Sequence, residues 1–245
     1  MLKKIIDGRW LTANGVIALM PANTVNDDDI EIYSDETRSQ VVFTYYGMRQ
    51  QTVKPVIDGV ARPNQCLSDF IAPKTIAEDY IGLFAVTAGL GTEKIEKRFI
   101  DANDDYSGIM FKSLADRLAE AFAEYMHERI RTDLWGYASD EKLDTNALIK
   151  EQYQGIRPAP GYPACPDHTV KADMFNMLQC EEIGMTLTDS FAMLPAAAVS
   201  GFYFAHKESK YFSVDKIDTD QLEDMAKRRN LPKDYLERWL APNLS

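Results

Sequence analysis

Several residue types and motifs are scarce in this chain of 245 residues, and each scarcity excludes a class of protein. Cysteine occurs three times, at Cys66, Cys165 and Cys180, with no Cys-x-x-Cys pair. This usage argues against a disulfide scaffold and favours free thiols in the cytoplasm. No apolar run reaches the roughly 20 residues of a membrane-spanning helix, and the first residues do not resemble a signal peptide.

Positive charge is also scarce. The chain carries 27 Lys and Arg residues against 38 Asp and Glu residues, a formal net charge of −11. Nucleic-acid binding depends on clustered Lys and Arg, so nucleic acid is not an expected partner. The sequence contains no G-x-G-x-x-G, G-x-S-x-G or P-loop motif, which argues against a Rossmann fold, an α/β-hydrolase and a P-loop nucleotidase.

What is present indicates a globular domain, with 45% hydrophobic and 27% charged residues. Apolar, β-branched and aromatic runs predict strands, and helical periodicity predicts helices. We expect strands over 15–20 (ended by Pro21), 30–35, 41–46, 79–91, 190–206 and 209–217, with a polar turn over 22–29. We expect helices over 1–11, 93–103, 112–136, 144–152, 170–183, 218–230 and 232–240.

Strands and helices come in groups without βαβ alternation, which favours an α+β fold with a largely antiparallel sheet in one domain. The longest helix, 112–136, is predicted to bury one apolar stripe at helical spacing. The stripe consists of Leu114, Leu118, Phe122, Tyr125, Met126, Ile130 and Leu134. Asp116, Glu120, Glu124 and His127 are predicted to follow a polar face of the same helix. Such carboxylates form either a solvated surface or, beside a cleft, a site for cationic groups.

The segment 157–169, "RPAPGYPACPDHT", is the least periodic part of the chain and contains four prolines. Prolines fix φ and remove backbone donors, so the segment is stiff and cannot lie inside a sheet. Arg157 could grip a carboxylate, and the backbone at Gly161 could approach a ligand closely. A rigid structural loop is the competing interpretation, and the residues alone leave both open.

Two further features have a functional and a structural interpretation. Cys165 and His168 form a Cys-x-x-His pair, but zinc needs three or four ligands and no second pair exists, so no metal site is expected. The aromatic run 202–212 is typical of a sheet core. Placed in a cleft, its rings could instead hold an adenine ring or cover a sulfonium.

The same residues resemble a known family. "GIRPAPGYPACPDHT" (155–169), "DYIGLFAVTAG" (79–89), "LADRLAEAFAEYMHERIR" (114–131), "MTLTDSFAMLPAAAVSGFYF" (185–204) and "ERWLAPNL" (237–244) occur in this order. They resemble the C-terminal S-adenosylmethionine-binding activation domain of cobalamin-dependent methionine synthase. The resemblance extends over essentially the whole chain.

The resemblance implies a C-shaped α+β domain, with a twisted antiparallel sheet flanked by helices, over residues 1–245. It implies that this chain is an N-terminally truncated part of a larger multi-domain enzyme, 5-methyltetrahydrofolate–homocysteine methyltransferase. The family's domain begins earlier, with a "DWTPFF"-like segment that supplies an aspartate near the ligand. The parent's cobalamin and zinc belong to other domains. This domain is expected to bind S-adenosylmethionine and to support the reductive remethylation of inactive cob(II)alamin.

The resemblance also assigns site residues by motif. Arg157 matches the arginine that meets the S-adenosylmethionine carboxylate, and Ala159 and Gly161 match positions where the backbone approaches the ligand. Tyr211 and Phe212 match the aromatic segment at the adenosine end.

Three further residues match acidic or docking positions. Glu120 matches an acid that faces the ligand. Tyr162 matches a tyrosine that points at the cobalamin, and Asp116 matches an acid that receives the released cobalt-ligating histidine of the neighbouring domain.

The implied partners are the cobalamin-binding domain of the same parent chain and a flavodoxin or flavoprotein reductase. A second hypothesis from a different class remains open. The chain could be a protein-docking module for the redox partner that does not bind the ligand itself.

Overall fold

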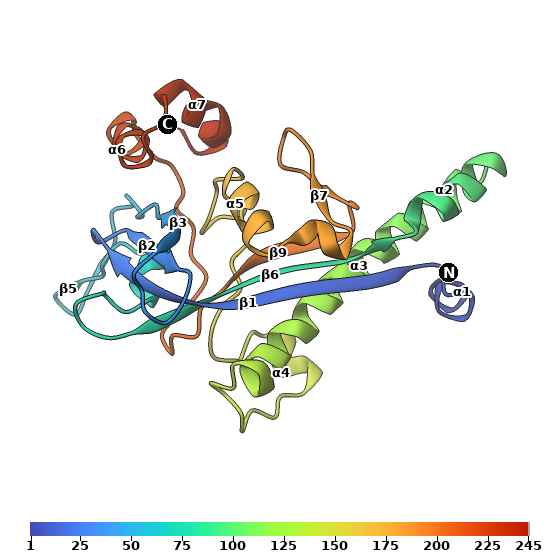
Figure 1. Cartoon of the computed structure of the whole chain (residues 1–245), viewed down its shortest axis with the longest axis horizontal. Coiled ribbons are helices and arrows are strands. Elements are labelled where there is room, and N and C mark those ends of the chain that lie inside the picture. The colour runs from blue at the N-terminus through green and yellow to red at the C-terminus, as the bar shows by residue number, and fades with distance from the viewer. Residues whose placement is uncertain (245) are drawn as a thin grey trace. The chain divides into compact units, whose positions relative to one another are not determined.

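A computed structural model describes residues 1–244, with Ile57 described by its backbone alone. The main sheet is antiparallel, with five strands in the order β3-β2-β1-β6-β9 (Figure 1). These strands are β1 (Thr12–Val25), β2 (Asp29–Tyr33), β3 (Val41–Tyr46), β6 (Asp79–Leu90) and β9 (Ala198–Tyr203). The pairs β4–β5 (Val56–Ile57, Val60–Ala61) and β7–β8 (Thr186–Leu187, Met193–Leu194) are small hairpins. The predicted α+β fold with a largely antiparallel sheet is confirmed.

The helices lie close to their predicted positions. They are α1 (Leu2–Gly8), α2 (Thr92–Asp101), α3 (Asp105–Arg129), α4 (Thr145–Ile149), α5 (Val170–Met177), α6 (Thr219–Arg229) and α7 (Lys233–Leu240). A π-helix (Ile130–Leu134) continues α3, and short 3-10 turns span Leu67–Phe70, Cys180–Ile183 and Ala241–Asn243.

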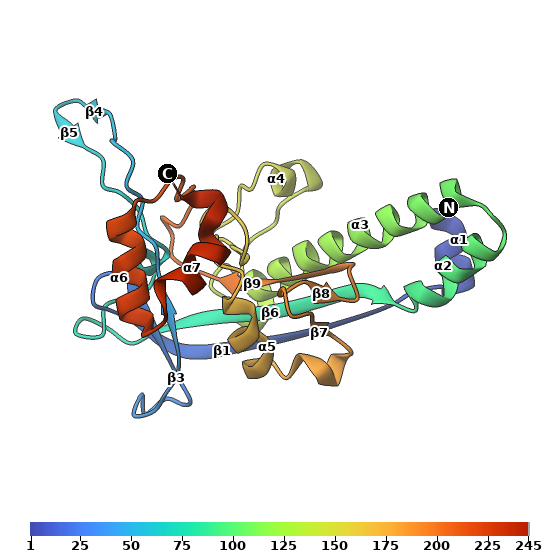
Figure 2. The same ribbon diagram turned by 90° about the horizontal axis from the view of Figure 1, so that it is seen from above.

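The strand β1 is longer than predicted, because Pro21 does not end it. The ladder between β1 and β2 begins with the pair Ala22↔Ile32, so Pro21 lies just outside it and no β1–β2 hydrogen bond is lost there. The predicted turn over 22–29 shrinks to three residues. Asn26 (φ 51°) and Asp27 (φ 67°) make it, in the left-handed region that these two residue types tolerate. The strand β1 then lies beside β6 over much of its length (Figures 1 and 2).

The chain divides into two compact units. Unit 1 consists of residues 1–18, 83–140 and 171–201, and unit 2 consists of residues 19–82, 141–170 and 202–245. The strands β1, β6 and β9 each contribute residues to both units. The single activation domain over 1–245, and its C-shaped outline, stay predictions.

Unit 1 is organised around α3. This helix begins seven residues before the predicted start at 112, because Asp104 caps it by accepting a hydrogen bond from the Ser107 N–H at 3.1 Å. Its most buried face carries small residues. Ala115 and Ala119 are 1% exposed and form a cluster with Ala88 and Ala197. Small side chains let the helix backbone approach its neighbours closely.

The predicted apolar stripe of α3 is therefore wrong in detail. Tyr125 is 51% exposed and Leu134 is 44% exposed, while Leu114 and Leu118 lie at the edge of the buried face. The predicted stripe contains only large apolar residues. Alanine is weakly hydrophobic, so a pattern of hydrophobic residues does not mark it as part of the buried face. Alanines form the middle of the buried face, and the large side chains of Phe111 and His127 are buried at its two ends. Ile130 of the predicted stripe is fully buried.

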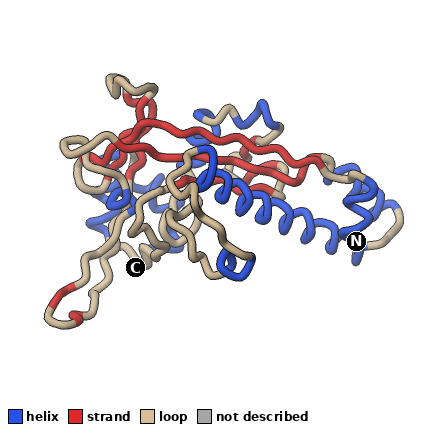
Figure 3. The backbone as a smooth tube through the Cα atoms, turned by 90° about the horizontal axis from the view of Figure 1, so that it is seen from below, coloured by secondary structure: helices blue, strands red, loops and turns tan. Residues whose placement is uncertain are grey.

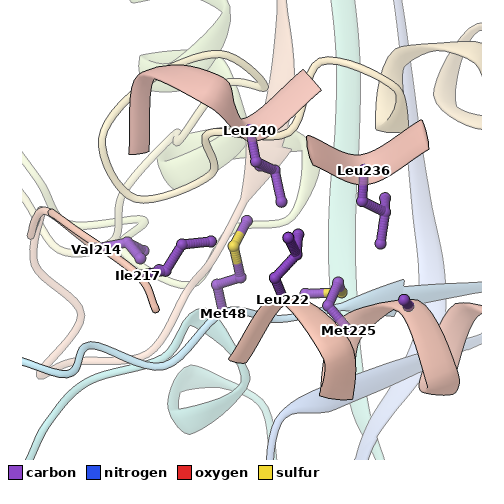
Figure 4. Close-up of a cluster of buried hydrophobic side chains, with 8 residues drawn as sticks. Met48, Val214, Ile217, Leu222, Met225, Leu236 and Leu240 are labelled. Atoms are coloured by element: carbon purple, nitrogen blue, oxygen red, sulfur yellow. The ribbon is translucent and has the colours of Figure 1, made fainter. Parts of the chain in front are cut away.

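Unit 2 has its own hydrophobic core between α6 and α7 (Figure 4). Its members are Met48, Val214, Ile217, Leu222, Met225, Ala226, Leu236 and Leu240. Phe212, Tyr46, Leu231 and Leu244 pack against this cluster. The core thus joins the C-terminal helices to the segment that follows β9.

The strand predicted over 209–217 is wrong, since the structure assigns no strand within these residues. Their backbone bonds to scattered partners instead of a neighbouring strand. The Val214 N–H donates to the Pro163 carbonyl at 2.9 Å, and Gln50 Nε2 donates to the Ser213 carbonyl at 2.6 Å. A periodic pattern of buried residues does not reveal that the backbone partners come from distant loops.

Within residues 1–244, the structure contains no helix long and apolar enough to cross a membrane.

We predict that Ala119→Leu destabilises the domain by about 1–3 kcal/mol, because the larger side chain would overpack the alanine cluster of α3. Urea unfolding followed by circular dichroism measures the difference. Ala121→Leu is the matched control, since Ala121 is exposed on the same helix. Equal stabilities of the two variants would contradict the close approach on this face.

We predict that the three cysteine thiols resist modification in the native state. All three are buried and none forms a disulfide, and burial raises the pKa of the Cys66 thiol to about 11 and that of Cys180 to about 12. The thiolate is the reactive form, so little of it exists at pH 8. An aromatic disulfide reagent should modify three thiols after denaturation and none rapidly before it. A fast native equivalent would show that one of these sites is open.

Candidate functional site

The proline-rich segment lies alongside the residues at the end of β9, within unit 2. Ile156 and Phe204 exchange two backbone hydrogen bonds of 3.0 Å, and the Phe202 N–H donates to the Pro158 carbonyl at 2.9 Å. The segment thus behaves as a short extra strand, although it is assigned as loop (tan in Figure 3). Pro158 and Pro160 have no backbone N–H, so these two positions carry no donor that needs a partner.

The tip of the segment is a closed turn. The Gly161 N–H donates to the Cys165 carbonyl at 2.7 Å, and the Cys165 N–H donates to the Tyr162 carbonyl at 2.9 Å. Gly161 has φ 96°, and a Cβ built on it would lie 2.1 Å from Cε1 of His168. Only glycine fits this position without strain and displacement of the imidazole.

Arg157 lies between two tyrosines. Its backbone N–H points away from β9 and donates to the Tyr211 hydroxyl oxygen at 3.0 Å. Its guanidinium donates from Nη1 to the Tyr153 hydroxyl oxygen, also at 3.0 Å. The side chain is half-buried, so part of it reaches the surface, and the hydrogen bond to Tyr153 orients its guanidinium.

The other residues predicted to contact the ligand or the cobalamin differ in their exposure. Tyr162 is 63% exposed and Gly161 is exposed, whereas Ala159 is half-buried. Phe212 packs against the core of unit 2, with its ring centroid 6.4 Å from that of Phe70. The structure therefore brings Arg157 and Tyr211 together and directs Phe212 mainly towards the core.

The predicted acidic residues belong to the other compact unit. Asp116 and Glu120 are exposed one turn apart on α3, and Glu120 forms a salt bridge of 2.6 Å with Arg117. The predicted polar face does not continue to His127, which is fully buried. The buried residues of α3 are spaced by four: Phe111, Ala115, Ala119, Ala123 and His127. On a helix of 3.6 residues per turn, such a series winds around the axis, so by position 127 the buried side has reached the line of Asp116.

The residues that first suggest zinc have other surroundings. Cys165 is 1% exposed, and its carbonyl closes the turn described above. His168 lies against Gly161. Among residues 1–244, the structure groups no three or more His, Cys, Asp or Glu side chains in a way that could hold a metal ion.

Two contributors were missed by the sequence analysis. Asp167 is buried, accepts hydrogen bonds from the N–H and hydroxyl of Thr169 at 2.8 and 2.9 Å, and pairs with Arg229 of α6. It thereby anchors the segment to the C-terminal helices. Tyr153 was missed as well, although it stands four residues before Arg157.

Comparison with known proteins points to one family. The model of the family "Vitamin B12 dependent methionine synthase, activation domain" matches residues 1–230. A solved structure, "Crystal Structure of the MetH Reactivation Domain bound to AdoHcy", is 53% identical in sequence and superimposes with a TM-score of 0.94. The match covers 100% of this chain and 74% of that one. This chain therefore belongs to the family of activation domains of vitamin B12-dependent methionine synthase.

Proposed function

We propose that this domain binds S-adenosylmethionine at the proline-rich segment and supports the reductive remethylation of cob(II)alamin in its parent enzyme. The observation that supports this most is the oriented guanidinium of Arg157, on a segment whose backbone is hydrogen-bonded to residues at the end of β9. The related reactivation domain, 53% identical, carries AdoHcy, which shares the amino-acid and adenosine ends of S-adenosylmethionine.

In this proposal, each end of the ligand has a recognisable partner. The guanidinium of Arg157 meets the ligand carboxylate through its planar fork. The backbone at Ala159 and Gly161 approaches the ligand, and Tyr211 with Phe212 contacts the adenosine end. Glu120 supplies negative charge towards the cationic part of the ligand.

The domain's task in this proposal is to position a methyl group. The sulfonium of S-adenosylmethionine is already activated, so no general acid or base is required. Cobalamin held by the neighbouring domain of the parent chain would, once reduced, be the methyl acceptor, and S-adenosylhomocysteine would be the product left on this domain. The exposed ring of Tyr162 would face the cobalamin on docking, and Asp116 would receive the histidine that leaves the cobalt.

The electron required for this reaction would come from a flavodoxin or flavoprotein reductase. The zinc of the parent enzyme, like its folate and homocysteine chemistry, belongs to other modules. A cytoplasmic location, where thiols stay reduced, is consistent with three buried cysteines that form no disulfide.

We predict that Arg157→Ala raises the Kd for S-adenosylmethionine by about tenfold to a hundredfold, the range for loss of a charged hydrogen-bonding partner. Arg157→Lys should fall in between, because an ammonium keeps the charge and loses the fork. Isothermal titration calorimetry measures both variants. Arg98→Ala, at an exposed position of α2, is the control and should bind like the wild type.

Two outcomes would count against this reading. Unchanged affinity of Arg157→Ala would remove Arg157 from the site. Absence of binding by the wild type would contradict ligand binding altogether and would favour the alternative, a docking module for the redox partner.

We predict that Gly161→Ala weakens S-adenosylmethionine binding, because φ 96° costs an L-residue about 1–2 kcal/mol and the new Cβ meets His168. His168→Ala added to this variant should restore only part of the affinity, since it removes the clash and leaves the backbone strain. Gly108→Ala is the matched control. A Cβ there would lie 3.6 Å from the Phe99 Cβ of α2, an ordinary van der Waals contact. Wild-type affinity in Gly161→Ala would show that the turn does not shape the site.

A further inference from the structure

The contact between Tyr153 and Arg157 is not a consequence of helical spacing. The two residues are four apart, yet residues 152–157 are not helical. Gly155, which is buried and has φ 91°, bends the chain between them. A backbone position reserved for glycine thus brings these two side chains to 3.0 Å.

Hydrogen bonds to residues 204 and 205 hold the chain on both sides of the bend at Gly155. The Gln154 side-chain Nε2 donates to the Ala205 carbonyl at 2.7 Å, and Ile156 pairs with Phe204 through two backbone hydrogen bonds. The position of Tyr153 relative to Arg157 is therefore set by the backbone, not by a flexible surface contact.

The two tyrosines act on different parts of Arg157. Tyr211 accepts from its backbone N–H, and Tyr153 accepts from Nη1 of its guanidinium. A phenol oxygen is a neutral acceptor, so the hydrogen bond from Nη1 to Tyr153 orients the guanidinium without placing a negative charge of its own beside it. An arginine side chain loses rotamer entropy on ordering, and a partner that orders it beforehand lowers the cost of binding.

We propose that Tyr153 is a positioning residue that orients the plane of the Arg157 guanidinium for a carboxylate, and so selects ligands that carry an amino-acid end. This inference rests on the proposed function, because it assumes that Arg157 meets the carboxylate of S-adenosylmethionine. It adds a residue and a specificity to that site. Tyr153 itself need not touch the ligand.

The test is a double-mutant cycle with S-adenosylhomocysteine, measured by calorimetry on the wild type, Tyr153→Phe, Arg157→Ala and the double variant. We expect Tyr153→Phe to raise the Kd by about fivefold to tenfold, within the range for a hydrogen bond to a charged group. In the Arg157→Ala background, the same change should have no further effect. Tyr106→Phe, which removes a hydroxyl from a side chain that is 74% exposed, is the control.

A second ligand separates positioning from general support of the fold. Methylthioadenosine keeps the adenosine end and lacks the carboxylate, so Tyr153→Phe should leave its Kd within about twofold. Equal weakening of both ligands, or additive effects of the two substitutions, would mean that Tyr153 only braces the segment, and would overturn the proposal. Unchanged S-adenosylhomocysteine affinity in Tyr153→Phe would also overturn it. In these cases the proposed function survives, whereas failure of the wild type to bind S-adenosylhomocysteine would overturn both.

Discussion

The backbone pairing of residues 156–158 with residues 202–204 is the constraint on which the candidate site depends. It places Ile156 and Pro158 against the end of β9 and turns the N–H of Arg157 to the opposite side, where Tyr211 accepts it. A strand-like segment offers alternate residues to alternate sides, so pairing on one side presents Arg157 on the other. The prolines around Arg157 stiffen this arrangement without leaving unpaired donors.

The rest of unit 2 holds that pairing in place. Asp167 joins the proline-rich segment to α6 through Arg229, and the Pro163 carbonyl receives the N–H of Val214. Val214 belongs to the hydrophobic core between α6 and α7. The C-terminal helices therefore hold the proline-rich segment in place, although no residue of these helices was assigned to the ligand.

Much of this fold could be predicted from residue patterns, and the failures share one cause. The strand Val41–Tyr46 and the helix Thr92–Asp101 were predicted almost to the residue, because local composition and periodicity determine them. Residues 209–217 were mistaken for a strand because their backbone partners are distant loops. The small-residue face of α3, at Ala115 and Ala119, was missed because close packing needs a small side chain whose hydrophobic signal is weak.

The candidate site was also predicted only in part. The prolines and Gly161 predicted a stiff turn from local sequence, whereas the identity of the ligand was predicted only from the family resemblance. The contact of Tyr153 with Arg157 depends on the backbone angle of Gly155, which a sequence pattern does not display.

A crystal structure of this domain with S-adenosylhomocysteine tests the central claim most directly. The account predicts the ligand carboxylate within hydrogen-bonding distance of the Arg157 guanidinium, with the pairing of residues 156–158 to residues 202–204 retained. A ligand bound elsewhere on the domain, or a carboxylate bound away from Arg157, would contradict it.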